Sequence, residues 1–538
     1  MLKLIRHRSA AILVAAALLW SAGPVDLFSA TSGASKKIVL LAGPLDTHPR
    51  ETHEYEKNVI LLKHCLETSP DLTGVRVEAH FNGWPADPAT LDDADAIFLT
   101  SGGSDRQETD HPLYVGDRFA QLEKQMRRGC GVVFFHWSTF HPRRVHDRIT
   151  EWAGGYFDYE GGTNANHWYS AIQTREWSTA LGSPAHPIAR GVQPFKLTEE
   201  FYFHLRFRDD DPRITPILLH TAAGDVEANT VGWAVQRKEG GRAFGFTGGH
   251  FFKNWWLADF RKLILNAIAW TAHIEVPRGG IRSSLEERRR VLIVTGANHP
   301  AHDWRATTAA LLFALEQDPR LLVEVTEDPG QLASPHLHEH ALVVLNYCNW
   351  ERPGLSAMAQ TNLTRYLSNG GGLSVIHFAN GAFHFSLPGA AQSDWPEYRH
   401  IVRRVWDHQG ASGHDAYGLF HVELGESHDI TRGLSGFDTM DELYFKQSGT
   451  NSIIPLATAR SKVTGQAEPM AWAHGYGAGR IFQTVLGHSA ESVQRAAPLM
   501  RRGSAWAAGL PPLSFDPPTR LLEHAAFRAG APWKPSPR

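Results

Sequence analysis

The sequence predicts an α/β protein with two tandem domains, each a mostly parallel sheet with helices on both faces. Two observations lead to this prediction. Three separate segments of the chain recur about 240 residues further on, which indicates one fold used twice. Within each copy, short apolar segments alternate with segments of helical periodicity, a pattern typical of parallel strands joined by helices.

The recurring segments carry the same polar residues at nearly constant offsets. They read GCGVVFFHW, TEEFYFHLRF and RAFGFTGGHF in the first copy, and GGGLSVIHF, MDELYF and RIFQTVLGHS in the second. The offsets are 241 residues between His136 and His377, 242 between Glu200 and Glu442, and 238 between His250 and His488. Each copy therefore contains an equivalent set of two histidines and one glutamate.

The order of elements can be followed through both copies. In the first, apolar strands are expected at 36–43, 75–80, 93–103 and 131–136, with helices at 54–67 and 118–129. In the second, strands are expected at 289–296, 321–328, 340–347 and 373–378, with helices near 307–316 and 363–371. Glycine closes several of these segments, as expected at helix C-termini and strand ends.

Length and composition predict where the domains, the linker and the tail begin and end. A chain of 538 residues is too long for one core. We expect a first domain at 37–276, a Pro/Gly/Ser-rich and charged linker at 277–288, a second domain at 289–510 and a proline-rich tail at 511–538.

The N-terminus has the charged, apolar and small-residue order of a secretory signal. Lys3, Arg6 and Arg8 precede an apolar run at 10–20, which is short for a stable membrane span. We expect a signal peptide at 1–30, cleaved after Ala30, and a periplasmic or secreted protein. A retained anchor is the alternative.

Charge and cysteine content exclude some partners. A net charge of −3, without a basic stripe, gives no basis for nucleic-acid binding. Three scattered cysteines form neither a disulfide framework nor a CxxC metal site. The expected partner is a small-molecule carbohydrate, and the sequence does not set the oligomeric state.

His136 and His377 are the first candidates for chemistry, because each follows the fourth strand of its copy. Ligands of open parallel sheets bind beyond the carboxyl ends of the strands. A buried, hydrogen-bonded histidine with a structural role is the alternative for a single copy. Recurrence at equivalent positions favours function.

Two further positions complete the candidate catalytic set. Aromatic neighbours of Glu200 and Glu442 would desolvate each carboxylate and raise its pKa toward the range of proton transfer. A solvated turn is the alternative. His250 and His488 end another apolar segment at a glycine, which is typical of close backbone approach.

These side chains suit acid/base catalysis, and they equally suit a divalent metal such as zinc or manganese. No HExxH-like spacing supports a metal, so no metal ligand is assigned and no cofactor is identified. Candidate substrate-binding residues line the surrounding loops: His48, His53, His167, His204, Arg206, Asn254, Trp255, His299 and His302.

In these segments the chain resembles the ThuA-like (trehalose utilisation) family, whose fold is similar to flavodoxin-like class I glutamine amidotransferase domains. The resemblance covers about 37–275 and 289–510, in strings such as HPLYVGDRFAQLEKQMRRGCGVVFFH, GGRAFGFTGGHFFKNWW and SHDITRGLSGFDTMDELYF. It implies a role in sugar metabolism, in association with oxidised (keto) disaccharides or glycosides.

One departure from the amidotransferases matters for the chemistry. Where those enzymes place a nucleophilic cysteine, this chain has His136 and His377, and Cys130 lies at the other end of its strand. Glutamine hydrolysis is therefore disfavoured. We expect an exported enzyme acting on a sugar or keto-glycoside, as an isomerase, lyase or hydrolase; the alternatives are a non-catalytic carbohydrate-binding or scaffold protein and a metal-dependent hydrolase.

Overall fold

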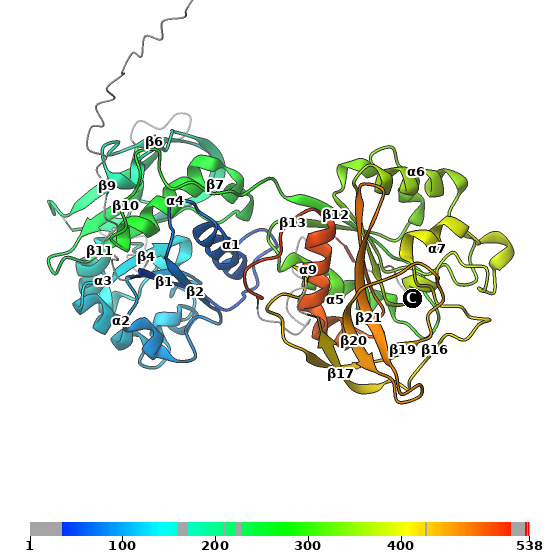
Figure 1. Ribbon diagram of the computed structural model, residues 1–538. Helices are drawn as coiled ribbons and strands as arrows, with labels where there is room; N and C mark the ends of the chain where they lie inside the picture. Colours follow the sequence, from blue (N-terminus) through cyan, green and yellow to red (C-terminus); the bar gives the residue numbers. More distant parts are fainter. Residues whose placement is uncertain are drawn as a thin grey trace, which may run out of the picture. The chain divides into compact units, whose positions relative to one another are not determined.

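The computed structural model describes residues 35–159, 170–208, 210–221, 228–425 and 428–517, together with 533, 534 and 536. The expected signal peptide at 1–30 and most of the expected tail at 511–538 lie outside the described residues. Within these described ranges, two nine-stranded sheets, one in each sequence repeat, dominate the structure (Figure 1). The predicted class, two tandem α/β domains, is confirmed.

The first domain, residues 37–271, begins with parallel strands and continues with antiparallel ones. The sheet order is β2 (Arg76–His80), β1 (Lys37–Ala42), β3 (Ala96–Thr100), β4 (Gly131–Phe135), β11 (Arg242–Phe246), β10 (Asn229–Gln236), β9 (Ile214–Thr221), β6 (Ala171–Leu181) and β7 (Lys196–Phe203). The helices are α1 (Tyr55–Glu67), α2 (Arg118–Arg127), α3 (His146–Ala153) and α4 (Ala258–Thr271). The short strands β5 (Gly155–Tyr156) and β8 (Arg206–Phe207) pair with each other.

The second domain, residues 289–507, repeats this order. Its sheet runs β13 (Leu321–Thr326), β12 (Arg289–Val294), β14 (Leu342–Leu345), β15 (Gly372–Ile376), β22 (Gly479–Thr484), β21 (Ala467–Tyr476), β20 (Pro455–Arg460), β17 (Gly418–Leu424) and β18 (Phe437–Asp441). The helices are α5 (Trp304–Glu316), α6 (Ala357–Ser368), α7 (Pro396–Val402), α8 (Ala490–Arg495) and α9 (Ala497–Ala507), and β16 (Gly413–His414) pairs with β19 (Tyr444–Phe445).

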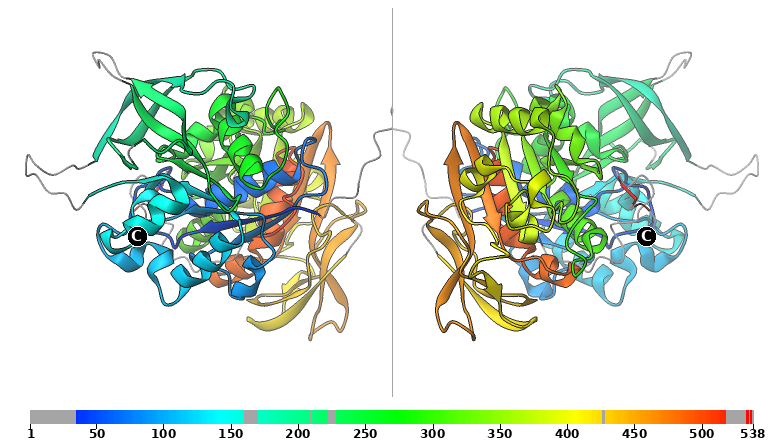
Figure 2. Two further views of the ribbon diagram at one scale, coloured as in Figure 1. Left: turned by 90° about the vertical axis from the view of Figure 1, so that its left-hand side faces the viewer. Right: turned by 90° about the vertical axis from the view of Figure 1, so that its right-hand side faces the viewer.

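The antiparallel half of each sheet is an addition to the sequence prediction. Strands β1, β3 and β4 are buried along their whole length, as parallel strands covered on both faces are. Strand β6 alternates between exposed and buried residues near its end, as a strand with one solvated face does. In both views of Figure 2 the antiparallel strands of the second domain, yellow to orange, lie side by side.

Each domain has its own hydrophobic core. The buried apolar side chains form one cluster from Ile38 to Ile281 and a second from Val291 to Leu510. Helices α1 and α4 contact the parallel strands of the first sheet, and α9 contacts β15 and β22 of the second. Because each core is complete within its repeat, each repeat can position a site by itself.

A glycine at the start of the fourth strand allows a helix end to approach that strand closely. A Cβ atom on Gly131 would lie 2.2 Å from the carbonyl oxygen of Thr271, at the end of α4. A Cβ on Gly372 would lie 2.2 Å from the carbonyl oxygen of Ala507, at the end of α9. The glycine that begins each of these two strands therefore has a packing role.

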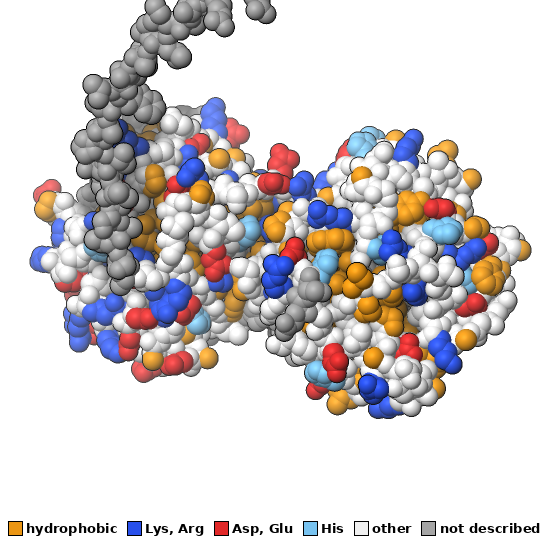
Figure 3. All heavy atoms as spheres, in the orientation of Figure 1, with side chains coloured by type: hydrophobic (Ala, Val, Ile, Leu, Met, Phe, Trp, Pro, Cys, Tyr) orange, Lys and Arg blue, Asp and Glu red, His pale blue; other side chains and the backbone are white. Residues whose placement is uncertain are grey.

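Two surface properties bear on partners. Among the described residues, no helix has both the length and the apolar character needed to cross a membrane. On the face drawn in Figure 3, acidic and basic side chains are interspersed, and no large patch of one sign covers it.

Candidate functional site

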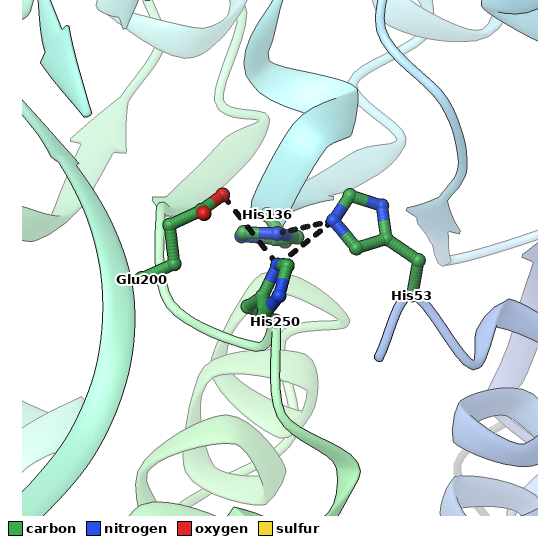
Figure 4. A group of neighbouring side chains, drawn as sticks. All are labelled: His53, His136, Glu200 and His250. Atoms are coloured by element: carbon green, nitrogen blue, oxygen red, sulfur yellow. Dashed lines mark hydrogen bonds and ion pairs between the residues drawn. The ribbon is translucent and has the colours of Figure 1, made fainter. Parts of the chain in front are cut away.

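Three histidines and one glutamate converge in each domain. His53, His136, Glu200 and His250 form the first cluster (Figure 4), and His302, His377, Glu442 and His488 form the second. Each side chain contributes one nitrogen or oxygen atom, and within each cluster these atoms all lie within 4.8 Å of one another. All six predicted catalytic residues thus lie in these two clusters.

His136 directly follows β4 and has a φ of 58°, in the left-handed region that non-glycine residues rarely occupy. This conformation turns the side chain back toward the end of β11. There the Nδ1–H of His136 donates to the carbonyl oxygen of Thr247 at 2.8 Å. Its Nε2 therefore carries the lone pair and faces the cluster.

His53 lies just before α1, and its ring approaches the ring of His136 within the cluster (Figure 4). The Tyr55 hydroxyl donates to Asp46 Oδ2 at 2.7 Å, so it accepts from Nδ1 of His53 at 2.8 Å. The Nε2 of His53 is thus an acceptor, lying 3.3 Å from Nε2 of His136 and 2.9 Å from Nδ1 of His250.

Strand β7 supplies the carboxylate and a phenol from one face. Side chains alternate across a strand, so Glu200 and Tyr202 point the same way. Tyr202 Oη lies 2.9 Å from Nε2 of His136, and Glu200 Oε1 lies 3.5 Å from Nδ1 of His250. Since His136 uses its Nδ1–H elsewhere, the phenol is the donor in this contact.

Glu199, on the other face of β7, holds the loop that carries His250. Its fully buried carboxylate accepts hydrogen bonds from the backbone N–H groups of Gly249 and His250, both at 3.0 Å. It also accepts from the Glu200 N–H and from the Asn254 side chain, both at 2.8 Å. Two adjacent glutamates therefore have separate tasks, one structural and one facing the cluster.

The second domain repeats this arrangement. His377 has a φ of 48°, its Nδ1–H donates to the Val485 carbonyl at 2.6 Å, and its Nε2 lies 2.9 Å from Tyr444 Oη. Nε2 of His377 is 3.3 Å from Nε2 of His302, and Nδ1 of His488 is 3.2 Å from Glu442 Oε2.

The surroundings of the second cluster differ in two details. The buried carboxylate is Asp441, which accepts from the N–H groups of Gly487, His488 and Glu442. His302 donates its Nδ1–H to the amide oxygen of Asn298 at 3.1 Å, where the first domain has a phenol and a carboxylate.

Burial controls the protonation of both clusters. Burial, followed by the neighbouring charge of His250, lowers the pKa of His136 well below its usual value. Burial lowers the pKa of His377 to about 3. These two rings are therefore neutral at pH 7. Burial also raises the pKa of Glu199 to about 7, although its four hydrogen bonds each act to lower that pKa.

The more exposed pair of the second cluster differs from the sequence expectation. Burial opposes the charged form of both His488 and Glu442, but their mutual contact outweighs it, which raises the pKa of His488 and lowers that of Glu442. The pKa increase that the sequence predicted for Glu442 thus occurs instead at its neighbour Asp441, whose pKa burial raises to about 7.

A cavity of about 220 Å³ opens over the second cluster. Its walls include the aromatic side chains of Trp350, Phe378 and Trp406, and its polar lining includes Glu442 and Tyr444. His299, His302, His408 and His414 also line it. An apolar-walled cavity with a few convergent polar groups is the usual form of a small-molecule site.

The predicted substrate-binding residues lie in different parts of the structure. His53 and His302 belong to the clusters themselves. The His48 ring stacks on His53 with a centroid separation of 3.7 Å, and His299 lines the cavity of the second domain. His204 is exposed beyond β7, Arg206 pairs with Asp158, and His167 lies outside the described residues.

Asn254 and Trp255 lie away from the expected substrate-binding surface, because both side chains are buried. Asn254 donates to Glu199 and supports the His250 loop. The Trp255 indole N–H donates to Asn58, and its ring stacks on Phe135 in the core, so it belongs to the packing of α1 against the sheet.

Tyr202 and Tyr444, together with the Glu199 and Asp441 carboxylates, were not among the predicted site residues. A signal for all four was present, because both copies contain an acidic pair followed by a tyrosine two residues after the second acid. By contrast, the cysteines lie apart from this chemistry: Cys130 is buried, and burial raises its pKa to about 12.

Comparison with known proteins gives matches in both domains. The family model described as ThuA, trehalose utilisation, matches residues 59–271 and 290–507. A ThuA-like protein from Parabacteroides merdae is 23% identical over 46% of this chain and 100% of its own, with a TM-score of 0.37. A ThuA-like protein from Bacteroides uniformis is 15% identical over 42% of this chain and 93% of its own, with a TM-score of 0.34.

A β-galactosidase from Rahnella sp. R3 is also similar, at 16% identity over 47% of this chain and 35% of its own, with a TM-score of 0.29. No curated protein matches the chain. The two family matches together span most of the sequence and contain all members of both clusters except His53. The chain therefore belongs to the ThuA (trehalose utilisation) family, with one family domain in each repeat.

Proposed function

We propose that this protein is an enzyme of carbohydrate metabolism that acts on a sugar or keto-glycoside by general acid/base catalysis. Membership of a family described by trehalose utilisation supports the substrate class. The observation that carries the proposal is the recurrence of three imidazoles, one carboxylate and one phenol in the same arrangement in both domains.

Proton removal next to a keto group needs a base and a donor to the oxygen that becomes negative. In the second domain the partly exposed pair of His488 and Glu442 would exchange the proton. Tyr444, which contacts the neutral ring of His377, would donate to the oxygen. His250, Glu200, Tyr202 and His136 would have these roles in the first domain. Isomerisation and elimination both begin with such a transfer, and hydrolysis of a keto-glycoside follows when water adds to the product of elimination.

The test is a turnover screen of disaccharides and their 3-keto forms with product identification by mass spectrometry and NMR. His136→Ala and His377→Ala should each remove one domain's contribution, and the double variant should lose at least about 10²-fold in kcat, a typical acid/base contribution. His336→Ala, an exposed histidine 72% accessible at its side chain and paired with Glu339, is the control and should retain full activity.

The aromatic walls of the cavity favour a second candidate, a non-catalytic carbohydrate-binding protein. Ring faces such as those of Trp350 and Trp406 suit the apolar faces of sugars. If calorimetry finds sugar binding, unchanged in the double histidine variant, and no preparation converts any tested glycoside, the binding role replaces the enzymatic one.

Export through the N-terminal segment is also proposed, from the sequence pattern of residues 1–30 alone. The expected result is recovery of the mature protein from the periplasm or medium, with Thr31 as its first residue. Cell fractionation and N-terminal sequencing check this, and an intact N-terminus in the membrane fraction would instead indicate a retained anchor.

A further inference from the structure

Two acceptor nitrogens face each other in each cluster. In the first domain, Thr247 and Tyr55 accept from the Nδ1 atoms of His136 and His53, which leaves both Nε2 atoms as acceptors 3.3 Å apart. In the second domain, Val485 and Asn298 do the same for His377 and His302, whose Nε2 atoms are also 3.3 Å apart. Neither Nε2 atom of a pair can donate to the other, whereas a cation can bind to both.

A proton is a poor cation for this position. His136 and His377 are only 1% and 2% exposed, and placing a charge on a buried imidazole is costly. A metal ion instead coordinates several lone pairs at once and leaves each imidazole neutral. The second nitrogens are already bound to backbone or side-chain acceptors, which is how metal-ligating histidines are usually oriented.

The distances agree with a small divalent ion. Zinc binds nitrogen and oxygen at about 2.0–2.2 Å in a tetrahedron, which places neighbouring ligand atoms about 3.3 Å apart. The observed Nε2 separations are 3.3 Å in both domains. The carboxylate-to-histidine distances are 3.5 Å for Glu200 and His250 and 3.2 Å for Glu442 and His488.

The fourth ligand supplies the negative charge. Three neutral imidazoles and one carboxylate form a set that suits zinc and related divalent ions. In the second domain, Nδ1 of His488 is buried and has no hydrogen bond within the described part of the chain, although it lies near Glu442. A coordinated ion would use this nitrogen.

We propose that each domain binds one divalent transition-metal ion, zinc or a similar cation, through three imidazole nitrogens and one carboxylate. The ligands are His53, His136, Glu200 and His250 in the first domain, and His302, His377, Glu442 and His488 in the second. The phenols of Tyr202 and Tyr444, which contact Nε2 of His136 and His377, would give up these hydrogen bonds when the ion binds. The proposal goes beyond the proposed function: with an ion bound these side chains are ligands, and the proton exchange proposed above belongs to the metal-free site, so metal binding is tested without turnover.

The two sites are not equivalent. His53 is supported by the Tyr55 hydroxyl and, through it, by the Asp46 carboxylate, whereas His302 is supported by the neutral amide of Asn298. A carboxylate in this outer position increases the basicity of the ligand, and removing such a support typically weakens metal binding 10- to 100-fold. We therefore expect tighter binding in the first domain.

The experiment uses the full chain, freed of metal by a chelator and titrated with Co²⁺ and Zn²⁺. We expect about two ions per chain, with Co²⁺ absorption bands in the visible range. His136→Asn and His377→Asn should each bind about one ion, and the double variant about none. His336→Ala should bind two. Tyr55→Phe should weaken one of the two binding events about 10- to 100-fold.

Circular dichroism verifies that each variant is folded, and Glu200→Gln and Glu442→Gln provide a second pair of ligand variants if a histidine variant is not. Less than about 0.1 ion per chain in the folded wild type, or two ions in the folded double variant, would overturn the proposal. Because no substrate is involved, a failure of metal binding is distinct from a failure of turnover.

Discussion

Glu199→Ala is expected to lower the free energy of unfolding of the first domain by about 3–5 kcal/mol. The Glu199 carboxylate accepts four hydrogen bonds, from three backbone N–H groups and from Asn254, and all four donors lie at 2.8 to 3.0 Å. Alanine leaves these donors without an acceptor, and an unsatisfied buried donor costs about 1–3 kcal/mol. Urea unfolding measures the loss.

The same variant should also displace His250, since two of the bonds hold the backbone of the loop that carries it. Glu200→Gln is the matched control, because its partly exposed side chain accepts from Thr174 and contacts His250 but holds none of the backbone N–H groups that Glu199 binds. We expect Glu200→Gln to change stability by less than about 1 kcal/mol while impairing the site. Equal destabilisation by both variants would contradict the separation of tasks.

Asp441→Ala offers a comparison within the chain. The Asp441 carboxylate accepts three N–H bonds where Glu199 accepts four, so its loss should destabilise the second domain by less than Glu199→Ala destabilises the first. Hydrogen exchange of peptides from the two loops assigns each effect to its domain.

Gly249→Ala is expected to be the second strongly destabilising change, at about 3–5 kcal/mol. Gly249 has a φ of 118°, where a side chain is strained, and a Cβ atom there would lie 2.2 Å from the Phe135 ring. Backbone strain and overpacking each cost about 1–3 kcal/mol, and they act together at this position.

Gly487→Ala separates the two causes. Gly487 has a similar φ of 122°, but the nearest atom to its Cβ would be Ile376 Cγ2 at 3.3 Å. Backbone strain, at about 1–3 kcal/mol, should therefore dominate, since the Ile376 methyl group needs to shift only slightly. Urea unfolding of the two variants should rank Gly249→Ala as more destabilising; the reverse order would show that the Phe135 ring moves aside at little cost.

Much of the fold followed from local sequence patterns. The apolar runs predicted β1, β3 and β4, and α1 was expected within one residue of its observed start. The antiparallel strands were not predicted, because β6 and β9 pair with strands that are distant or follow long loops. The first six residues of β6 are exposed or half-buried on both faces, so its sequence has little apolar alternation there.

Part of the candidate site could also be predicted from local patterns, and the part that depends on non-local pairing could not. His136 and His377 were found because a strand end and a repeat pointed to them. His53 and His302 were expected to line the same crevice, since each follows the first strand of its copy. Their direct contacts with these histidines depend on the parallel pairing of the strands, which local patterns do not encode. The separate roles of Glu199 and Glu200 depend on which face of β7 each occupies.

The presence of a complete cluster in each domain affects how this protein tolerates mutation. No residue belongs to both clusters, so a harmful substitution in one domain leaves the cluster of the other domain intact. Single-site screens would then underestimate the importance of these residues, and a null phenotype would require paired changes. Such redundancy would also allow one copy to diverge in specificity while the other preserves the original task.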